Sequence, residues 1–163
     1  MEDMNQQLIA NAICNIPDPE IPVINIQELG VLRQVMWDNG RLNITITPTY
    51  SGCPAMHAIE KDIRDVLMQH CVTDFEIVTV LHPAWTTDWM TEEARAKLEA
   101  YGIAPPLYTT ADKNLITLRP KVIQCPRCGS AEISLVSQFG STACKALYKC
   151  IACMEPFDYF KCI

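Results

Sequence analysis

The sequence predicts an α+β protein with two parts: a small domain with the element order α-β-β-α-β-α, and a C-terminal β module stapled by metal. Helical and strand-like apolar periods follow one another up to about residue 103. Two Cys-x2-Cys pairs lie near the C-terminal end. Residues 1–119 carry eight Lys and Arg against sixteen Asp and Glu, whereas residues 120–163 carry five against three. We therefore expect a domain over 1–106, a linker over 107–121 and a module over 122–163.

The first elements follow from apolar spacing. One amphipathic helix is predicted by Leu8, Ile9, Ala12, Ile13 and Ile16. The prolines of IPDPEIP must end this helix, since each lacks a backbone donor and restricts the residue before it. The stretch from Leu29 to Thr49 predicts a β-hairpin, because Asn39-Gly40 suits a tight turn and apolar residues alternate with polar ones after it.

A second helix, a strand and a third helix are expected next. Apolar residues recur at helical spacing from Ala55 to Leu67, and Pro54 suits the first helical turn. Residues 75–81 are rich in β-formers and predict a buried strand reached by a βαβ crossover. The third helix runs from an N-cap at Thr91 to a stop at Gly102. The Pro-Pro pair at residues 105–106 and the mostly polar residues after it predict the linker.

Composition excludes several classes of protein. Hydrophobic residues make up 49% of the 163 residues and charged residues 20%, which is typical of a globular chain. No apolar run is long enough to cross a bilayer, and the acidic N-terminus does not resemble a signal peptide, so we expect a cytoplasmic protein. The net charge of −6 argues against nucleic acid as the main partner. In a reducing cytosol, nine cysteines are expected to be ligands or reactive thiols.

Four of the six cysteines of the C-terminal module have the spacing of a metal site. Cys125 and Cys128 form C-P-R-C-G, and Cys150 and Cys153 form C-I-A-C after an interval of twenty-one residues. Two such knuckles can supply a tetrahedral set of four sulfurs, which suits structural Zn²⁺ and a zinc-ribbon-like module. Mononuclear iron, a small iron–sulfur cluster and unligated thiols stay open as alternatives. A structural zinc would supply roughly 10–16 kcal/mol of folding free energy.

Cys53 is a candidate reactive thiol of the N-terminal domain. It lies where a strand leads into a helix, and the positive end of the helix dipole would favour its thiolate. His57 is four residues further on, so the two side chains could share a helix face and a metal. Asp18 and Glu20 lie in a loop that could approach Cys53. The alternative is a packed cysteine, an exposed histidine and two solvated acids.

Two further thiols and two tryptophans are weaker candidates. Cys144 precedes Lys145, whose ammonium would favour a thiolate, and Cys162 follows Lys161. Either cysteine could instead be a small buried apolar residue. Trp85 and Trp89 could form a recognition surface, since tryptophan is enriched at interface hot spots, or could pack in the core. No phosphate-binding glycine loop, nucleophile elbow or zinc-protease helix is present.

The sequence resembles two known families. The stretches IPDPEIPVINIQELGVLRQV, ITPTYSGCPAM and PAWTTDWMTEEARAKLEAYGIAPP resemble the MIP-type domain of SufT and of cytosolic iron–sulfur assembly factors. The marks of that domain are the D-P-E turn and the T-x-x-x-C-P motif, here Thr49 through Cys53-Pro54. The ending QFGSTACKALYKCIACMEPFDYFKCI is similar to that of the PaaD family, the accessory subunit of the bacterial phenylacetyl-CoA epoxidase of phenylacetate degradation.

The resemblance implies a maturation or accessory role and no catalytic activity of the chain's own. In that pathway the oxygenase carries a di-iron centre, and its reductase carries a flavin and a [2Fe–2S] cluster. A transient iron–sulfur cluster or iron would bind through Cys53, with Cys144 or Cys162 as helpers, and the oxygenase or reductase subunits would be the partners. The alternatives are a structural subunit that transfers no metal and a thiol enzyme. Unpaired hairpin edges are also compatible with a homodimer.

Overall fold

The computed structural model describes residues 2–107 and 122–161, which form two compact units divided between Trp85 and Thr86. The sequence places the main boundary after residue 106, whereas the units divide before the third helix. The α+β class, with three helices and two sheets, agrees with the prediction. Among the described residues, no helix is both long enough and apolar enough to span a membrane.

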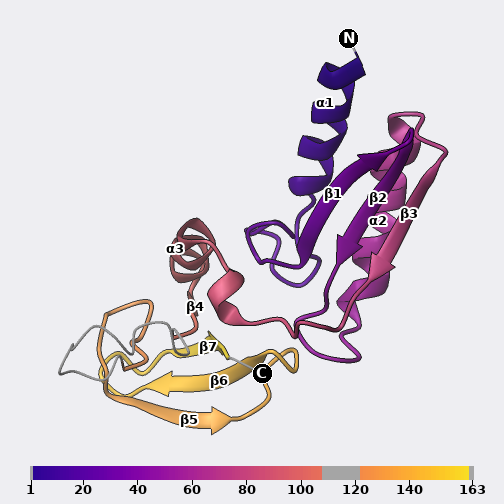
Figure 1. The fold of residues 1–163 in the computed structure, drawn as a ribbon. Helices are drawn as coiled ribbons and strands as arrows, with labels where there is room; N and C mark the ends of the chain where they lie inside the picture. The colour runs from indigo at the N-terminus through magenta and orange to yellow at the C-terminus, as the bar shows by residue number, and fades with distance from the viewer. Residues whose placement is uncertain (1, 108–121, 162–163) are drawn as a thin grey trace, which may run out of the picture. The chain divides into compact units, whose positions relative to one another are not determined.

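The first unit consists of a three-stranded sheet and two helices, α1 (Glu2–Cys14) and α2 (Ala55–Gln69) (Figure 1). Strands β1 (Leu32–Asp38) and β2 (Arg41–Ile46) form the predicted antiparallel hairpin. The turn residues Asn39 and Gly40 both have positive φ, at 49° and 86°. Strand β3 (Phe75–Thr79) pairs parallel with β2, so α2 is the crossover helix of a βαβ unit.

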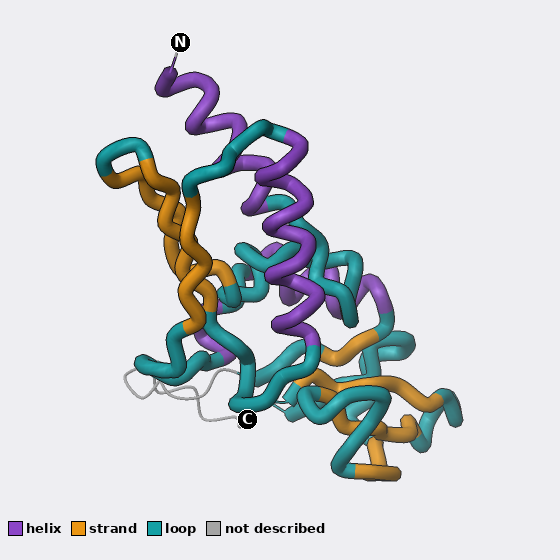
Figure 2. Tube along the Cα trace, turned by 90° about the vertical axis from the view of Figure 1, so that its right-hand side faces the viewer, coloured by secondary structure: helices purple, strands orange, loops and turns teal. Residues whose placement is uncertain are grey.

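The core of this unit lies between the sheet and the helices, which share one side of it (Figure 2). Every second side chain of β2 is fully buried, namely Leu42, Ile44 and Ile46. Three apolar residues of α2 on one helix face are buried too: Ile59, Ile63 and Leu67. The prediction of a buried strand at residues 75–81 is wrong in one respect. Strand β3 is an edge strand with half-buried and exposed side chains, because only one of its edges has a neighbour.

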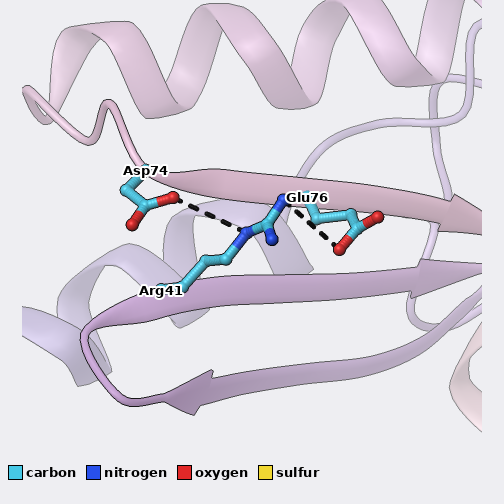
Figure 3. A network of polar contacts seen from close by, with 3 residues as sticks. All are labelled: Arg41, Asp74 and Glu76. Atoms are coloured by element: carbon cyan, nitrogen blue, oxygen red, sulfur yellow. Dashed lines mark ion pairs between the residues drawn. The ribbon is translucent and has the colours of Figure 1, made fainter.

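An exposed ion-pair network joins the hairpin to β3. The guanidinium of Arg41 lies 3.6 Å from the carboxylate of Asp74 and 3.3 Å from that of Glu76 (Figure 3). All three side chains are about half exposed or more, so these pairs contribute little to the free energy of unfolding. Their effect is to favour the register in which the first residues of β2 and β3 lie side by side.

The second unit begins with a short 3-10 helix, η1 (Thr87–Trp89), followed by α3 (Glu92–Tyr101). The predicted ends of α3 are confirmed: the Thr91 hydroxyl accepts a 3.1 Å hydrogen bond from the amide of Ala94, and Gly102 has φ 92°. A four-stranded sheet follows in the order β4-β7-β6-β5, made of β4 (Ile103–Ala104), β5 (Ile133–Ser137), β6 (Lys145–Cys150) and β7 (Pro156–Phe160).

Helix α3 belongs to the second unit because strand β4 pairs parallel with β7. Ala104, which the sequence assigns to the end of the first domain, is therefore part of the sheet of the second unit. The buried side chain of Arg95 ties the neighbouring segments together by donating hydrogen bonds to the carbonyls of Thr87 and Pro106. The fully buried cluster next to the cysteine pairs consists of Ala104, Cys125, Cys150 and Phe157, with half-buried side chains such as Tyr148 and Ile133 packed against it. Two of its four members are thus candidate ligands.

Candidate metal centre and the Cys53 turn

The two Cys-x2-Cys pairs come together at one end of the β5–β7 sheet. The sulfur atoms of Cys125, Cys128, Cys150 and Cys153 all lie within 4.8 Å of one another. Cys150 ends β6, and Cys153 follows in the turn before β7. Within residues 2–107 and 122–161, this is the one group of three or more His, Cys, Asp or Glu side chains close enough to share a metal ion.

The distances between the sulfurs match those of a tetrahedral zinc site. Four sulfurs at the usual Zn–S distance of about 2.3 Å form a tetrahedron whose edges are roughly 3.8 Å. The sulfurs of Cys125 and Cys153 lie 3.8 Å apart, and those of Cys128 and Cys150 lie 3.5 Å apart. These two distances, with all four sulfurs within 4.8 Å of one another, fit a four-thiolate metal centre. Cys125 and Cys150 are buried, while Cys128 is exposed and forms the solvent side of the centre.

Backbone N–H groups of the knuckles favour sulfur anions. A hydrogen bond from the backbone of Cys153 is the main cause that lowers the pKa of Cys150 to about 7. A hydrogen bond from the backbone of Ser130 also lowers the pKa of Cys128. A hydrogen bond with the Cys150 side chain and desolvation outweigh it and raise the pKa of Cys128 to about 12. The thiolate of Cys150 therefore forms readily, whereas the neighbouring sulfurs oppose a second thiolate at Cys128. A cation is what allows all four protons to leave.

Cys53 lies in the turn between β2 and α2, immediately before the N-cap residue Pro54. Its thiol is half-buried, and burial is the main cause that raises its pKa above the ordinary value. Hydrogen bonds from the Ala55 backbone and the Thr49 hydroxyl act in the opposite direction. The expected low-pKa thiolate at the helix N-terminus is therefore wrong for the structure, because desolvation outweighs the helix amides.

The Asp18 loop brings negative charge to Cys53. The carboxylates of Glu20 and Asp18 lie close enough to raise the pKa of the thiol further. Asp18 is only 5% exposed, and its Oδ1 accepts hydrogen bonds from the amides of Glu20 at 3.0 Å and Ile21 at 2.8 Å. The amide of Asp18 also donates to the carbonyl of Ile24 at 2.9 Å. Asp18 thus shapes the loop that presents Glu20.

The remaining candidate residues are distributed over both units. His57 is exposed on α2, so the structure supports its alternative as a surface histidine. Cys144 is buried, with its sulfur 3.0 Å from the Thr142 hydroxyl, and is not the exposed thiol expected from Lys145. Cys162 lies outside the described residues.

The two tryptophans are not exposed as a pair. Trp85 is 5% exposed, and its indole donates a 3.0 Å hydrogen bond to the Leu29 carbonyl, so it packs in the first unit and offers no interface. Trp89 is half-buried in η1 of the second unit. The hydrogen bond between the Thr49 hydroxyl and Cys53 was not expected from the sequence, although the T-x-x-x-C-P motif contains both residues. The position of Thr49 four residues before the cysteine, at a strand end, was the available signal.

Comparison with known proteins identifies both units. The family model described as "PaaD zinc beta ribbon domain" matches residues 109–161, and the model described as "Iron-sulfur cluster assembly protein" matches residues 6–71. The crystal structure of a domain of unknown function, DUF59, from Bacillus anthracis has a TM-score of 0.52 at 28% identity and covers 59% of this chain and 92% of that one.

Three relatives are similar in sequence. A protein from Escherichia coli K12, named as a subunit of a "Putative 1,2-phenylacetyl-CoA epoxidase", is 50% identical over 93% of this chain and 89% of its own length. The Fe-S protein maturation auxiliary factor YitW of Bacillus subtilis is 34% identical over 60% of this chain and 97% of its own. A factor of the same description from Porphyromonas gingivalis is 35% identical over 55% of this chain and 87% of its own. The chain therefore belongs to the PaaD family, with an iron–sulfur cluster assembly domain followed by a PaaD zinc β-ribbon domain.

Proposed function

We propose that this chain is an accessory maturation factor of a phenylacetyl-CoA epoxidase system, and that it assists iron–sulfur cluster or iron-centre assembly in a reductase or oxygenase subunit through Cys53. The name of the E. coli relative supports the pathway, and the names of the B. subtilis and P. gingivalis relatives support Fe–S maturation. A reducing cytoplasm is the proposed compartment, in keeping with Cys14, Cys53 and Cys71, none of which is in a disulfide.

The chemistry around Cys53 carries the proposal. Its raised pKa keeps the thiol protonated at neutral pH, which makes it a slow nucleophile toward an acyl group. The same carboxylates that disfavour the thiolate favour a cation at the sulfur. An incoming iron ion can therefore displace the proton, forming an S–Fe bond and releasing H⁺ to solvent. This environment selects a cationic cargo over an electrophilic substrate and disfavours the thiol-enzyme alternative.

The ribbon has a separate, structural role in this proposal. The four clustered cysteines of the second unit would hold Zn²⁺ permanently, because a closed set of four sulfurs leaves no position for exchange. Cys128, Cys125, Cys150 and Cys153 would thus keep the small β module folded for docking. In this proposal the zinc ion keeps the module folded, and Cys53 binds the iron.

A Cys53→Ser variant in the full chain tests the proposal. In cells that express the epoxidase system, the reductase and oxygenase would be purified and their iron, sulfide and visible absorption measured. We expect lower cofactor occupancy with C53S and unchanged occupancy with Cys71→Ser, a matched control because Cys71 is an exposed thiol of the same unit. Full occupancy with C53S would refute the role of Cys53.

A structural subunit without metal transfer is the second candidate. The ribbon exposes three large apolar side chains on and after β5, Leu135, Val136 and Phe139, each at least 49% exposed. An apolar surface of this kind is typical of a docking face. This alternative predicts stable co-purification with oxygenase subunits and no effect of C53S on cofactor occupancy.

A further inference from the structure

Three of the four sheet edges in the described chain carry a feature that discourages pairing with another strand. The edge strand β1 has a register shift between Leu32 and Gln34, and the edge strand β5 has one between Leu135 and Ser137. The edge strand β4 is only two residues long. Register shifts and short strands are recognised protections against edge-to-edge association.

Strand β3 is the edge without a register shift or a shortened strand, and Glu76 is its one charged residue. Its five residues, FEIVT, pair with β2 in an uninterrupted register from Phe75 to Thr79. The strand contains no proline, lysine or bulge, and four of its five residues are strong strand formers. Val78 is 41% exposed, and Leu81 just beyond the strand is 64% exposed. An edge of this kind fits an added strand.

The hydrogen bonds to β2 show which backbone groups face outward. The Leu42 amide donates to the Asp74 carbonyl at 3.1 Å, and the Val80 amide donates to the Ile46 carbonyl at 2.9 Å. Backbone groups of alternate residues face the same edge of a strand. Even-numbered residues of β3 therefore face β2, and the N–H and C=O groups of Phe75, Ile77 and Thr79 face the free edge.

We propose that β3 is a homodimer interface, in which β3 pairs antiparallel with β3 of a second copy about a two-fold axis at Ile77. This register pairs the whole of β3 with itself and uses the outward groups of Phe75, Ile77 and Thr79. It places Glu76 opposite Val78 of the second copy, so no acid faces an acid. An axis at Glu76 would place two carboxylates face to face, which is unfavourable. The result is one six-stranded sheet with the helices of both copies on the same face.

Charge variants at Val78 test both the interface and its register. In Val78→Glu, two new Glu–Glu pairs form across the axis, and we expect the dimer Kd of the full, zinc-loaded chain to rise roughly two- to thirtyfold. In Val78→Lys, the new ammonium faces Glu76, and we expect an unchanged or lower Kd. Gln34→Glu is the matched control, because it adds the same charge to an exposed position of the opposite edge strand, β1. Sedimentation equilibrium measures Kd, and circular dichroism checks folding.

Hydrogen exchange gives an independent readout. The outward amides of Ile77 and Thr79 should exchange slowly in concentrated protein and rapidly on dilution, whereas those of Glu76 and Val78 should be protected in both. A monomer at all concentrations would overturn the proposal, as would equal effects of the Glu and Lys variants at Val78 or a loss of dimer in the Gln34 control. Protection of Ile77 that arises only when a reductase or oxygenase subunit is added would assign the edge to that partner instead.

Discussion

Removal of the metal should unfold the second unit and spare the first. The core beside the centre contains Ala104 and Phe157 together with two of the ligand cysteines themselves, Cys125 and Cys150. Burial of one phenylalanine contributes about 1.5–3 kcal/mol. A structural zinc contributes about 10–16 kcal/mol, which equals or exceeds the entire net stability of an ordinary domain, about 5–15 kcal/mol. Two of the four buried members of this cluster are ligands, so the cluster loses its order with the metal, and the other buried side chains of the unit, such as Leu98 and Phe160, must then hold it without the ribbon knuckles.

Hydrogen exchange with mass spectrometry, before and after treatment with a strong chelator, measures this outcome segment by segment. We expect β5, β6 and β7 to lose protection, and α3 and β4 to lose it with them, because β4 is held by β7. Helices α1 and α2 should keep their protection. If α3 and β4 instead kept the protection of the first unit, the domain boundary would lie near residue 106. A ribbon that stays protected without metal would refute the argument that the ion stabilises it.

Three further predictions concern thiols and the core. Glu20→Gln should lower the pKa of Cys53, since the charge of Glu20 raises it. Peptide mapping at neutral pH should then show that Cys53 is alkylated faster, by a factor below about ten. An unchanged rate would place Glu20 away from the thiol. Zinc affinity measured by competition should fall by up to about four powers of ten for each pH unit of acidification below pH 7, because four thiols must lose their protons to bind the ion and acid restores the proton of Cys150, whose pKa is lowered to about 7. A pH-independent affinity would exclude thiolate ligands. Ile44→Ala should lower the free energy of unfolding by about 2–5 kcal/mol in urea titration, against a small effect for exposed Leu8→Ala; similar losses at both sites would show that β2 is not the core strand.

Local patterns were sufficient to predict most of the first unit. The Asn39-Gly40 turn, the alternation of β2 and the stripe of α2 are properties of neighbouring residues, and the structure confirms each of them. The four-cysteine group was equally predictable, because two residues between cysteines fix the shape of each knuckle.

The domain boundary could not be predicted in this way. It depends on the pairing of Ile103 and Ala104 with Asp158 and Tyr159, far along the chain. A two-residue strand has no periodicity, and the neighbouring prolines favoured a linker. The position of β3 at an edge has the same origin, since an apolar run does not reveal whether one or two strands lie beside it.

Trp85 and Cys53 differ from expectation because burial decides their behaviour. The sequence showed a tryptophan in a connecting segment, but its indole reaches the Leu29 carbonyl, which is fifty-six positions earlier. At Cys53 the helix N-terminus was correctly located, yet desolvation and the carboxylates of the Asp18 loop reverse its effect on the pKa. The sequence predicts the direction of one contribution to the pKa, that of the helix N-terminus, whereas the tertiary structure determines the total shift.

The proposed division of thiols between the two units follows from the number of sulfurs at each place. Four thiolates close the coordination sphere of a metal ion and hold it tightly, which suits a permanent structural role. One thiol beside two carboxylates leaves most of that sphere open, so an iron ion or cluster at Cys53 would bind weakly and leave readily toward a client with more ligands. With its zinc bound, the ribbon offers no vacant sulfur to compete for that cargo. Iron that co-purifies with the chain should therefore be lost on gel filtration, whereas zinc should remain at one ion per chain.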